Sequence, residues 1–177
     1  MNLPNILTSL RIALIPLFLY YLVKNDFTYA LIVFFLGSIT DALDGFIARK
    51  FHQITDLGKI LDPAADKLFL VTSFTAAYLV NLLPVWLFLA ALIKDLVTVS
   101  GYALLIYLKH KIDVKPIVAG KASTAFQMIT ILLILLNGVG IGNDILLLSV
   151  MFITALLLFY SMLTYVMIGF RINREGY

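Results

Sequence analysis

Cysteine is absent from this 177-residue chain, and charged side chains are scarce. The lack of cysteine excludes disulfide bridges, thiolate metal sites and a cysteine nucleophile. Only 13% of the residues are charged and 62% are apolar, whereas soluble domains have about 25% charged and about 45–50% apolar residues. A soluble chain of this length needs far more polar surface. The composition therefore excludes a soluble globular enzyme, a disordered chain and a nucleic-acid-binding module, and it indicates an integral membrane protein.

Long apolar runs separated by short polar stretches predict the architecture. Their length favours helices, and no strand-like alternation persists along the chain. Because about 20 apolar residues cross a bilayer as a helix, we expect a single all-α domain over residues 1–177 with six transmembrane helices. The opening stretch, residues 1–9, is a candidate for an additional helix that lies along the membrane interface. The expected spans are 12–23, 27–48, 63–83, 85–108, 118–137 and 144–170.

The positive charges of the connecting segments are distributed unequally between the two sides of the membrane. The segments expected on one side of the membrane are the N-terminus, 49–62, 109–121 and 171–177. These segments are rich in lysine and arginine, whereas the segments on the other side contain Lys24 alone. Such a bias predicts that the basic segments and both termini are cytosolic. We therefore expect a multi-pass protein of the plasma (inner) membrane.

Five of the ten acidic residues lie in or around the loop between the second and third expected spans, and four of them lie close to the ends of these spans. Charges within membrane spans are costly and usually functional. Asp41 and Asp44 lie near the end of one span and Asp62 and Asp66 near the start of the next, each pair with helical spacing, so we expect the four to converge. Four carboxylates repel each other unless cations lie between them. Oxygen ligands suit Mg²⁺, Mn²⁺ or Ca²⁺, and paired ions about 4 Å apart serve phosphoryl chemistry.

Smaller and basic residues accompany these aspartates. Gly45 and Ala48 leave room for a substrate against the backbone, and Arg49 can form a forked contact with a phosphate. Gly58 frees the backbone before the third helix, and the proline after Asp62 predicts that the helix starts there, with Asp62 as its cap. The pattern favours a metal-dependent enzyme that acts on phosphates. A structural ion-pair cluster and a cation or proton transporter that uses the same carboxylates remain alternatives.

The segment from Asp41 to Asp66 resembles the signature of the CDP-alcohol phosphatidyltransferases. It reads Asp-Ala-Leu-Asp-Gly-Phe-Ile-Ala-Arg, then eight residues, a glycine, three residues, an aspartate, three residues and an aspartate. Two further regions are similar to this family, namely the Asn-Leu-Pro-Asn opening (2–5) with Thr8 and Arg11, and Gly120-Lys121 followed by Thr124 and Gln127.

The resemblance implies a six-helix membrane enzyme, usually a homodimer, whose active site faces the cytosol. A CDP-linked lipid such as CDP-diacylglycerol gives its phosphatidyl group to a small or lipid alcohol, and CMP leaves. By position, two divalent ions (Mg²⁺ or Mn²⁺) are bound by Asp41, Asp44, Asp62 and Asp66, with Asp66 as the general base. The implied CDP-binding residues are Gly45, Ala48, Arg49 and Gly58, with Asn5 and Thr8 as further candidates.

The acceptor alcohol is less sharply indicated. Family members that use glycerol 3-phosphate commonly have Arg-Glu in the fourth helix and a second arginine eight residues after the first. The matching positions here are Lys94, Asp95 and Tyr102, and lysine contacts phosphate only as a point charge. Residues 114–116 and the segment after them also resemble the cardiolipin synthase branch, whose acceptor is phosphatidylglycerol. We expect glycerol 3-phosphate, with phosphatidylglycerol and an inositol phosphate as alternatives.

Lysines are the candidate ligands of the acceptor. Lys94 is the only cation within the fourth expected span, where an unpaired charge is costly. It points about 100° away from its neighbour Asp95 on a helix, so the two need not pair with each other. A structural ion pair with another helix and a contact with the acceptor's phosphate are both open for Lys94. The candidate acceptor ligands are Lys94, Lys115 and Lys121.

The four aspartates lead to a test of metal dependence. CMP release from CDP-diacylglycerol should stop after thorough chelation and return when Mg²⁺ or Mn²⁺ is added, because uncompensated carboxylates repel the donor's pyrophosphate. Asp41→Asn should raise the metal concentration needed for half-maximal rate. Turnover that survives chelation, or an Asp41→Asn variant with unchanged metal dependence and rate, would contradict the metal site.

Overall fold

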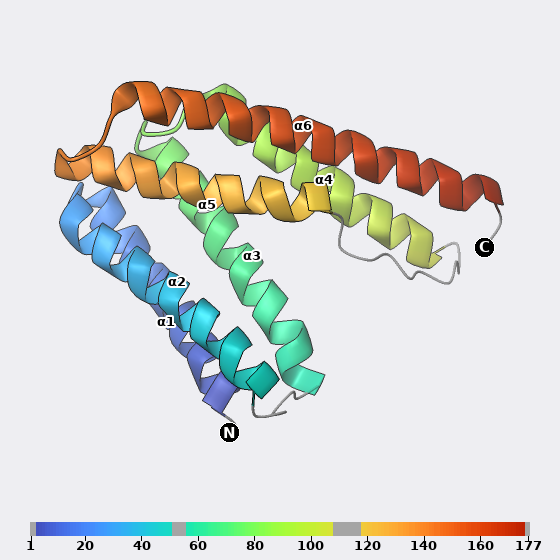
Figure 1. Cartoon of the computed structure of the whole chain (residues 1–177), viewed down its shortest axis with the longest axis horizontal. Helices are drawn as coiled ribbons and strands as arrows, with labels where there is room; N and C mark the ends of the chain where they lie inside the picture. Colours follow the sequence, from blue (N-terminus) through green and yellow to red (C-terminus); the bar gives the residue numbers. More distant parts are fainter. Residues whose placement is uncertain (1–2, 51–55, 108–117, 176–177) are drawn as a thin grey trace. The chain divides into compact units, whose positions relative to one another are not determined.

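The computed structural model is all-helical over the residues it describes, which are 3–50, 56–107 and 118–175 for the backbone. Side chains are described for residues 9–40, 65–101 and 118–169. Each of the expected apolar runs corresponds to one helix, so the all-α class is confirmed (Figure 1). The helices are α1 (Leu3–Val23), α2 (Phe27–Lys50), α3 (Asp56–Leu79), α4 (Val85–Tyr107), α5 (Val118–Val139) and α6 (Asp144–Glu175).

Two helix starts differ from the sequence-based expectation. α1 begins at Leu3 and continues without a break, so the expectation of a separate interfacial helix in the opening stretch is wrong. α3 begins at Asp56, which places Gly58 in its first turn and Asp62 inside the helix instead of at its cap. The reason is that the segment before the proline already has apolar residues at helical spacing, and a proline near a helix start does not have to be its first residue.

The helices form two compact units. The first unit comprises Met1–Leu83 and Ile131–Asn143, and the second comprises Pro84–Thr130 and Asp144–Tyr177. The first unit therefore contains α1, α2, α3 and the end of α5, and the second contains α4, the start of α5 and α6. The expected organisation as a single domain stays a prediction.

In the first unit α1 packs against both α2 and α3. Three phenylalanines, one from each helix, form its aromatic core: the ring centroid of Phe18 is 6.2 Å from that of Phe34 and 5.6 Å from that of Phe69. Phe34 and Phe69 are 5.9 Å apart. Gly37 of α2 also borders this core, and a Cβ there would lie 3.5 Å from the Phe69 ring, at ordinary contact distance. Such tilted aromatic contacts add to the stabilisation from burial of the rings.

In the second unit α4 packs against α6, and hydroxyl groups join α5 to α6. The Oγ1 atoms of Thr130 and Thr154 are 3.0 Å apart, and the Thr154 hydroxyl also lies 3.3 Å from the Phe126 carbonyl oxygen. At the other contact, Trp86 of α4 stacks on Phe152 of α6 with 5.4 Å between ring centroids. Because both threonines are fully buried, their mutual hydrogen bond satisfies polar groups that would otherwise be costly.

Two helices are long and apolar enough to cross a membrane, among the segments that the structure describes. They are α5 and the part of α6 from Asp144 to Gly169. α1 and α2 contain shorter apolar segments, Ser9–Val23 and Phe27–Thr40. The spanning of all the helices therefore stays a prediction.

The close approach of α5 to Phe27 generates a test of packing within the first unit. A Cβ at Gly138 would lie only 2.3 Å from Cγ of Phe27, so Gly138→Ala should lower the free energy of unfolding by about 1–3 kcal/mol, as overpacking does. Gly101→Ala is the matched control, because a Cβ there meets nothing within 4 Å. Thermal unfolding in detergent is the measurement. In a Phe27→Ala background the effect of Gly138→Ala should shrink, and an equal loss in both backgrounds would contradict the contact.

Candidate active site

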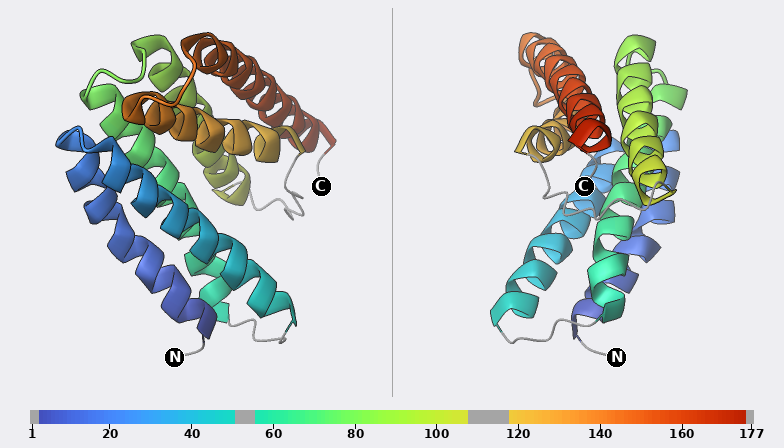
Figure 2. Two further views of the ribbon diagram at one scale, coloured as in Figure 1. Left: turned by 60° about the vertical axis from the view of Figure 1, so that its left-hand side comes forward. Right: turned by 90° about the vertical axis from the view of Figure 1, so that its right-hand side faces the viewer.

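The motif aspartates lie on two helix ends of the first unit. Asp41 and Asp44 are in the last part of α2, and Asp62 and Asp66 are in the first half of α3. These two ends lie at the same end of the unit, where α1 also begins, in Figure 1 and in both views of Figure 2. The backbone is therefore arranged as convergence of the aspartates requires. The side chains of Asp41, Asp44 and Asp62 lie outside the described residues.

The predicted donor-binding residues occupy the same end of the first unit. Gly45, Ala48 and Arg49 are in the last turns of α2, whereas Gly58 is in the first turn of α3. Asn5 and Thr8 are in the first turns of α1, and all these side chains lie outside the described residues. Their roles stay predictions.

Asp66 is the motif aspartate whose side chain is described, and it forms an ion pair with Arg11 of α1. The guanidinium Nη1 donates to Oδ1 of Asp66. The Arg11 side chain is 2% exposed, whereas that of Asp66 is 43% exposed. Such a charge-assisted hydrogen bond is stronger than a neutral one, and here it joins α1 to α3.

Sequence reasoning noticed Arg11 only as a feature of the N-terminus and missed its partner. A signal was present, because Arg11 is the single charge in the apolar stretch from Leu10 to Val23. A charge in such a stretch requires a counter-charge. The spacing along the chain did not identify that counter-charge, since the two residues are 55 positions apart.

The chemistry of the motif side chains fits divalent metal ions. The donors are carboxylate oxygens, the chain has no cysteine, and hard cations such as Mg²⁺ and Mn²⁺ prefer oxygen. Among the side chains that the structure describes, no group of three or more His, Asp or Glu residues is close enough to hold a metal. Asp66 is the single motif aspartate in that set, so the metal site stays a prediction.

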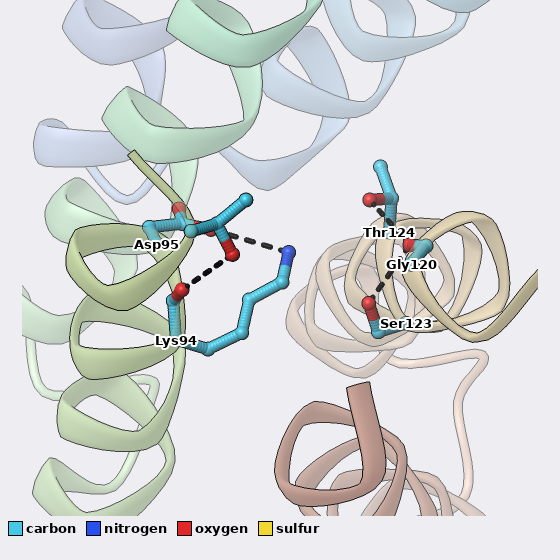
Figure 3. Close-up of polar contacts among 6 residues, drawn as sticks. Lys94, Asp95, Gly120, Ser123 and Thr124 are labelled. Atoms are coloured by element: carbon cyan, nitrogen blue, oxygen red, sulfur yellow. Dashed lines mark hydrogen bonds and ion pairs between the residues drawn. The ribbon is translucent and has the colours of Figure 1, made fainter. Parts of the chain in front are cut away.

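Lys94 lies in the second unit and is 5% exposed. Its Nζ is 3.2 Å from Oδ1 of Asp95, so the expectation that these neighbours need not pair is wrong. The reason is that the long lysine stem can fold back to its own helix, and burial makes a neutralising contact valuable. The Lys94 side chain also leaves α4 in the direction of the α5 turn that carries Gly120, Ser123 and Thr124 (Figure 3).

That turn of α5 is polar and closely packed. Ser123 is fully buried and donates to the carbonyl oxygen of Gly120 at 2.8 Å. A Cβ at Gly120 would lie 2.7 Å from the Tyr165 hydroxyl, so α5 and α6 approach closely because residue 120 has no side chain. Lys121, in the same turn, is exposed. The third candidate acceptor ligand, Lys115, lies outside the described residues.

Comparison with known proteins decides the family. A sequence profile of the CDP-alcohol phosphatidyltransferases matches residues 1–169. The chain belongs to this family. The resemblance seen in the aspartate motif is thereby confirmed over nearly the whole length of the chain, and the protein is a transferase.

Two named activities occur among the relatives of this CDP-alcohol phosphatidyltransferase. The chain is 35% identical over 176 residues to the CDP-diacylglycerol--glycerol-3-phosphate 3-phosphatidyltransferase of Aquifex aeolicus, and the aligned region covers 97% of each chain. It is 46% identical over 76 residues to the protein of the same name from Pseudomonas fluorescens, or 41% of this chain and 39% of the other. A CMP-forming cardiolipin synthase of Streptomyces coelicolor is 38% identical over 101 residues, which is 54% of this chain and 47% of the relative.

Proposed function

We propose that this protein transfers the phosphatidyl group of CDP-diacylglycerol to glycerol 3-phosphate and releases CMP. The observation that carries the proposal is the 35% identity, over 97% of both chains, with the CDP-diacylglycerol--glycerol-3-phosphate 3-phosphatidyltransferase of Aquifex aeolicus. The unbroken aspartate motif, on helix ends that lie together, supports the same reaction. A transferase family argues against the cation or proton transporter that the carboxylates alone allowed.

The proposed reaction is a single in-line displacement. The acceptor's hydroxyl oxygen attacks the phosphorus of the phosphatidyl group and forms the new P–O bond. The bond from that phosphorus to the oxygen of CMP breaks, and CMP leaves with the electron pair. Asp66 accepts the hydroxyl proton as general base. Arg49 and the small residues Gly45, Ala48 and Gly58 would hold the cytidine diphosphate, with Asn5 and Thr8 beside them.

Two Mg²⁺ or Mn²⁺ ions, held by Asp41, Asp44, Asp62 and Asp66, would stabilise the negative charge on the pyrophosphate and on departing CMP. A covalent phosphatidyl-enzyme is disfavoured because cysteine is absent and the motif carboxylates are needed for the ions.

The surface of the protein supports a membrane setting, as the proposed reaction does. α6 exposes large apolar side chains at helical spacing, among them Phe152, Leu156, Phe159 and Leu163. Exposed apolar area of this kind calls for lipid or another protein to cover it. We propose six membrane spans with both termini and the active site on the cytosolic side, and a homodimer. The acyl chains of the donor explain why a phosphate-transferring enzyme is embedded in lipid.

Lys94 is the proposed contact of the acceptor's phosphate. An ammonium group has three N–H donors, so Lys94 can contact Asp95 and a phosphate together. The buried setting favours such a contact, since charge-assisted hydrogen bonds gain strength where water is excluded. Lys121, exposed one residue after Gly120, and Lys115 are the further proposed ligands.

Cardiolipin synthesis is the second candidate function. The Streptomyces coelicolor relative is 38% identical in the aligned region, and Tyr102 replaces the arginine that glycerol-3-phosphate users commonly have. In that reaction phosphatidylglycerol is the acceptor, and CMP leaves as before. A phosphatidylinositol-phosphate-type reaction, with an inositol phosphate as acceptor, is the remaining alternative.

The acceptor can be identified with purified protein, CDP-diacylglycerol and Mg²⁺. We expect CMP and phosphatidylglycerophosphate to form when glycerol 3-phosphate is supplied, with saturation that follows its bulk concentration. Mass spectrometry of the lipid product is the measurement, and reactions without acceptor are the control. Product with phosphatidylglycerol alone, saturating with its surface fraction in micelles, would establish cardiolipin synthesis instead.

The role of Lys94 predicts a selective effect on the acceptor. Lys94→Met removes the ammonium but keeps the length of the side chain, and the loss of a charge-assisted contact should raise the acceptor's KM by about 10- to 150-fold. The donor's KM should change little, and Lys94→Arg should keep most of the affinity. Lys24→Met, at an exposed position outside the site, is the control. An unchanged acceptor KM together with a lower unfolding temperature would make Lys94 a structural partner of Asp95.

A further inference from the structure

Arg11 occupies a core position of the first unit. It belongs to the buried face of α1, which has the helical spacing of a core stripe and comprises Arg11, Leu14, Ile15, Phe18 and Leu22. Arg11 is 1% exposed, so its stem and guanidinium are removed from water as completely as the apolar members of the stripe. Burial of a charge is costly unless it is paired. The ion pair with Asp66 compensates this buried charge, and because Asp66 belongs to the aspartate motif, the pair also bears on the candidate site.

The two partners differ in their surroundings. Arg11 reaches Asp66 from the inside of the unit, while the Asp66 side chain remains 43% exposed. The Asp66 carboxylate thus contacts the buried guanidinium through Oδ1, while part of its side chain stays exposed. The aromatic contact between Phe18 and Phe69, 5.6 Å apart, also packs α1 against α3, about two turns from Arg11 along α1 and one turn from Asp66 along α3. The buried guanidinium therefore restricts the conformations that the partly exposed carboxylate can adopt.

We propose that Arg11 is the positioning residue of Asp66. It fixes the orientation of the carboxylate for the reacting hydroxyl, and it acts on catalysis through Asp66. This inference rests on the proposed function, in which Asp66 is the general base. The physical gain is pre-organisation, because a base that is already oriented loses no rotational freedom when the substrate arrives.

Two other roles would leave different kinetic signatures. If Arg11 contacted the donor's pyrophosphate, its removal would raise the KM for CDP-diacylglycerol. If Arg11 were only a structural counter-ion, its removal would lower the unfolding temperature while each folded molecule kept the normal kcat. A positioning role predicts a lower kcat for folded protein with little change in the donor's KM.

The test is a double-mutant cycle on the full-length protein in detergent. Arg11→Gln should lower kcat by about 10- to 100-fold, the usual effect of removing a group that orients an active-site ligand. Asp66→Asn should lower kcat by about 10²–10⁴-fold, the contribution of a positioned base. At saturating Mg²⁺, adding Arg11→Gln to Asp66→Asn should change the residual rate by no more than about twofold, because an amide at position 66 cannot take the proton in any orientation. Rates are normalised to folded protein by size-exclusion chromatography and thermal unfolding.

Arg11→Lys is the second variant, in case Arg11→Gln folds poorly. It keeps the charge and one donor, so it should retain more kcat than Arg11→Gln. Lys24→Gln controls for the loss of a positive charge elsewhere. An equal loss of rate in both backgrounds, a selective rise in the donor's KM, or a normal kcat for folded Arg11→Gln would each overturn the inference. The absence of CMP release from the unmodified protein would instead overturn the proposed function.

Discussion

The ion pair between Arg11 and Asp66 is the interaction on which the first unit depends. It pairs a buried guanidinium on α1, the helix that contacts both α2 and α3, with a carboxylate of the motif, and removal of one partner of a buried pair is strongly destabilising. α1 therefore serves as the common support of the two helices that carry the aspartate motif. The aromatic core of Phe18, Phe34 and Phe69 provides the apolar part of that support, and the ion pair provides a directional contact between α1 and α3.

Most of the fold could be predicted because each long apolar run of the sequence corresponds to one helix. Helix ends were harder to predict, since a helix can extend beyond its apolar part. α3 illustrates this: its first turns contain Gly58 and Asp62, which suggested a loop and a cap. The polar start of α1 was separated from its apolar continuation for the same reason, although the backbone runs through both.

The candidate site divides in the same way. The motif spacing predicted which residues share the loop end of α2 and α3, because helical periodicity within 26 residues is local information. Contacts that depend on tertiary packing could not be predicted from the sequence. Arg11 could be identified as anomalous but not assigned to Asp66. For Lys94 we considered partners outside its own helix, but the contact in the structure is with the adjacent Asp95. The reason is that the flexible four-carbon stem can place the ammonium group away from the direction of the Cα–Cβ bond.

The buried side chains of Arg11 and Lys94 also differ in when their contacts with aspartate can form during synthesis of the chain. Lys94 contacts Asp95, the next residue along the chain, so this contact needs only α4 to be formed. The buried hydroxyl groups of Ser73 and Thr154 likewise find acceptors within their own helices, because each donates to a carbonyl oxygen one turn back. The contact of Arg11 with Asp66 is different, because the two residues are 55 positions apart. It can form only after α3 has been synthesised, so the joining of α1 to α3 through this ion pair comes later in the biogenesis of the protein than the synthesis of the first helix.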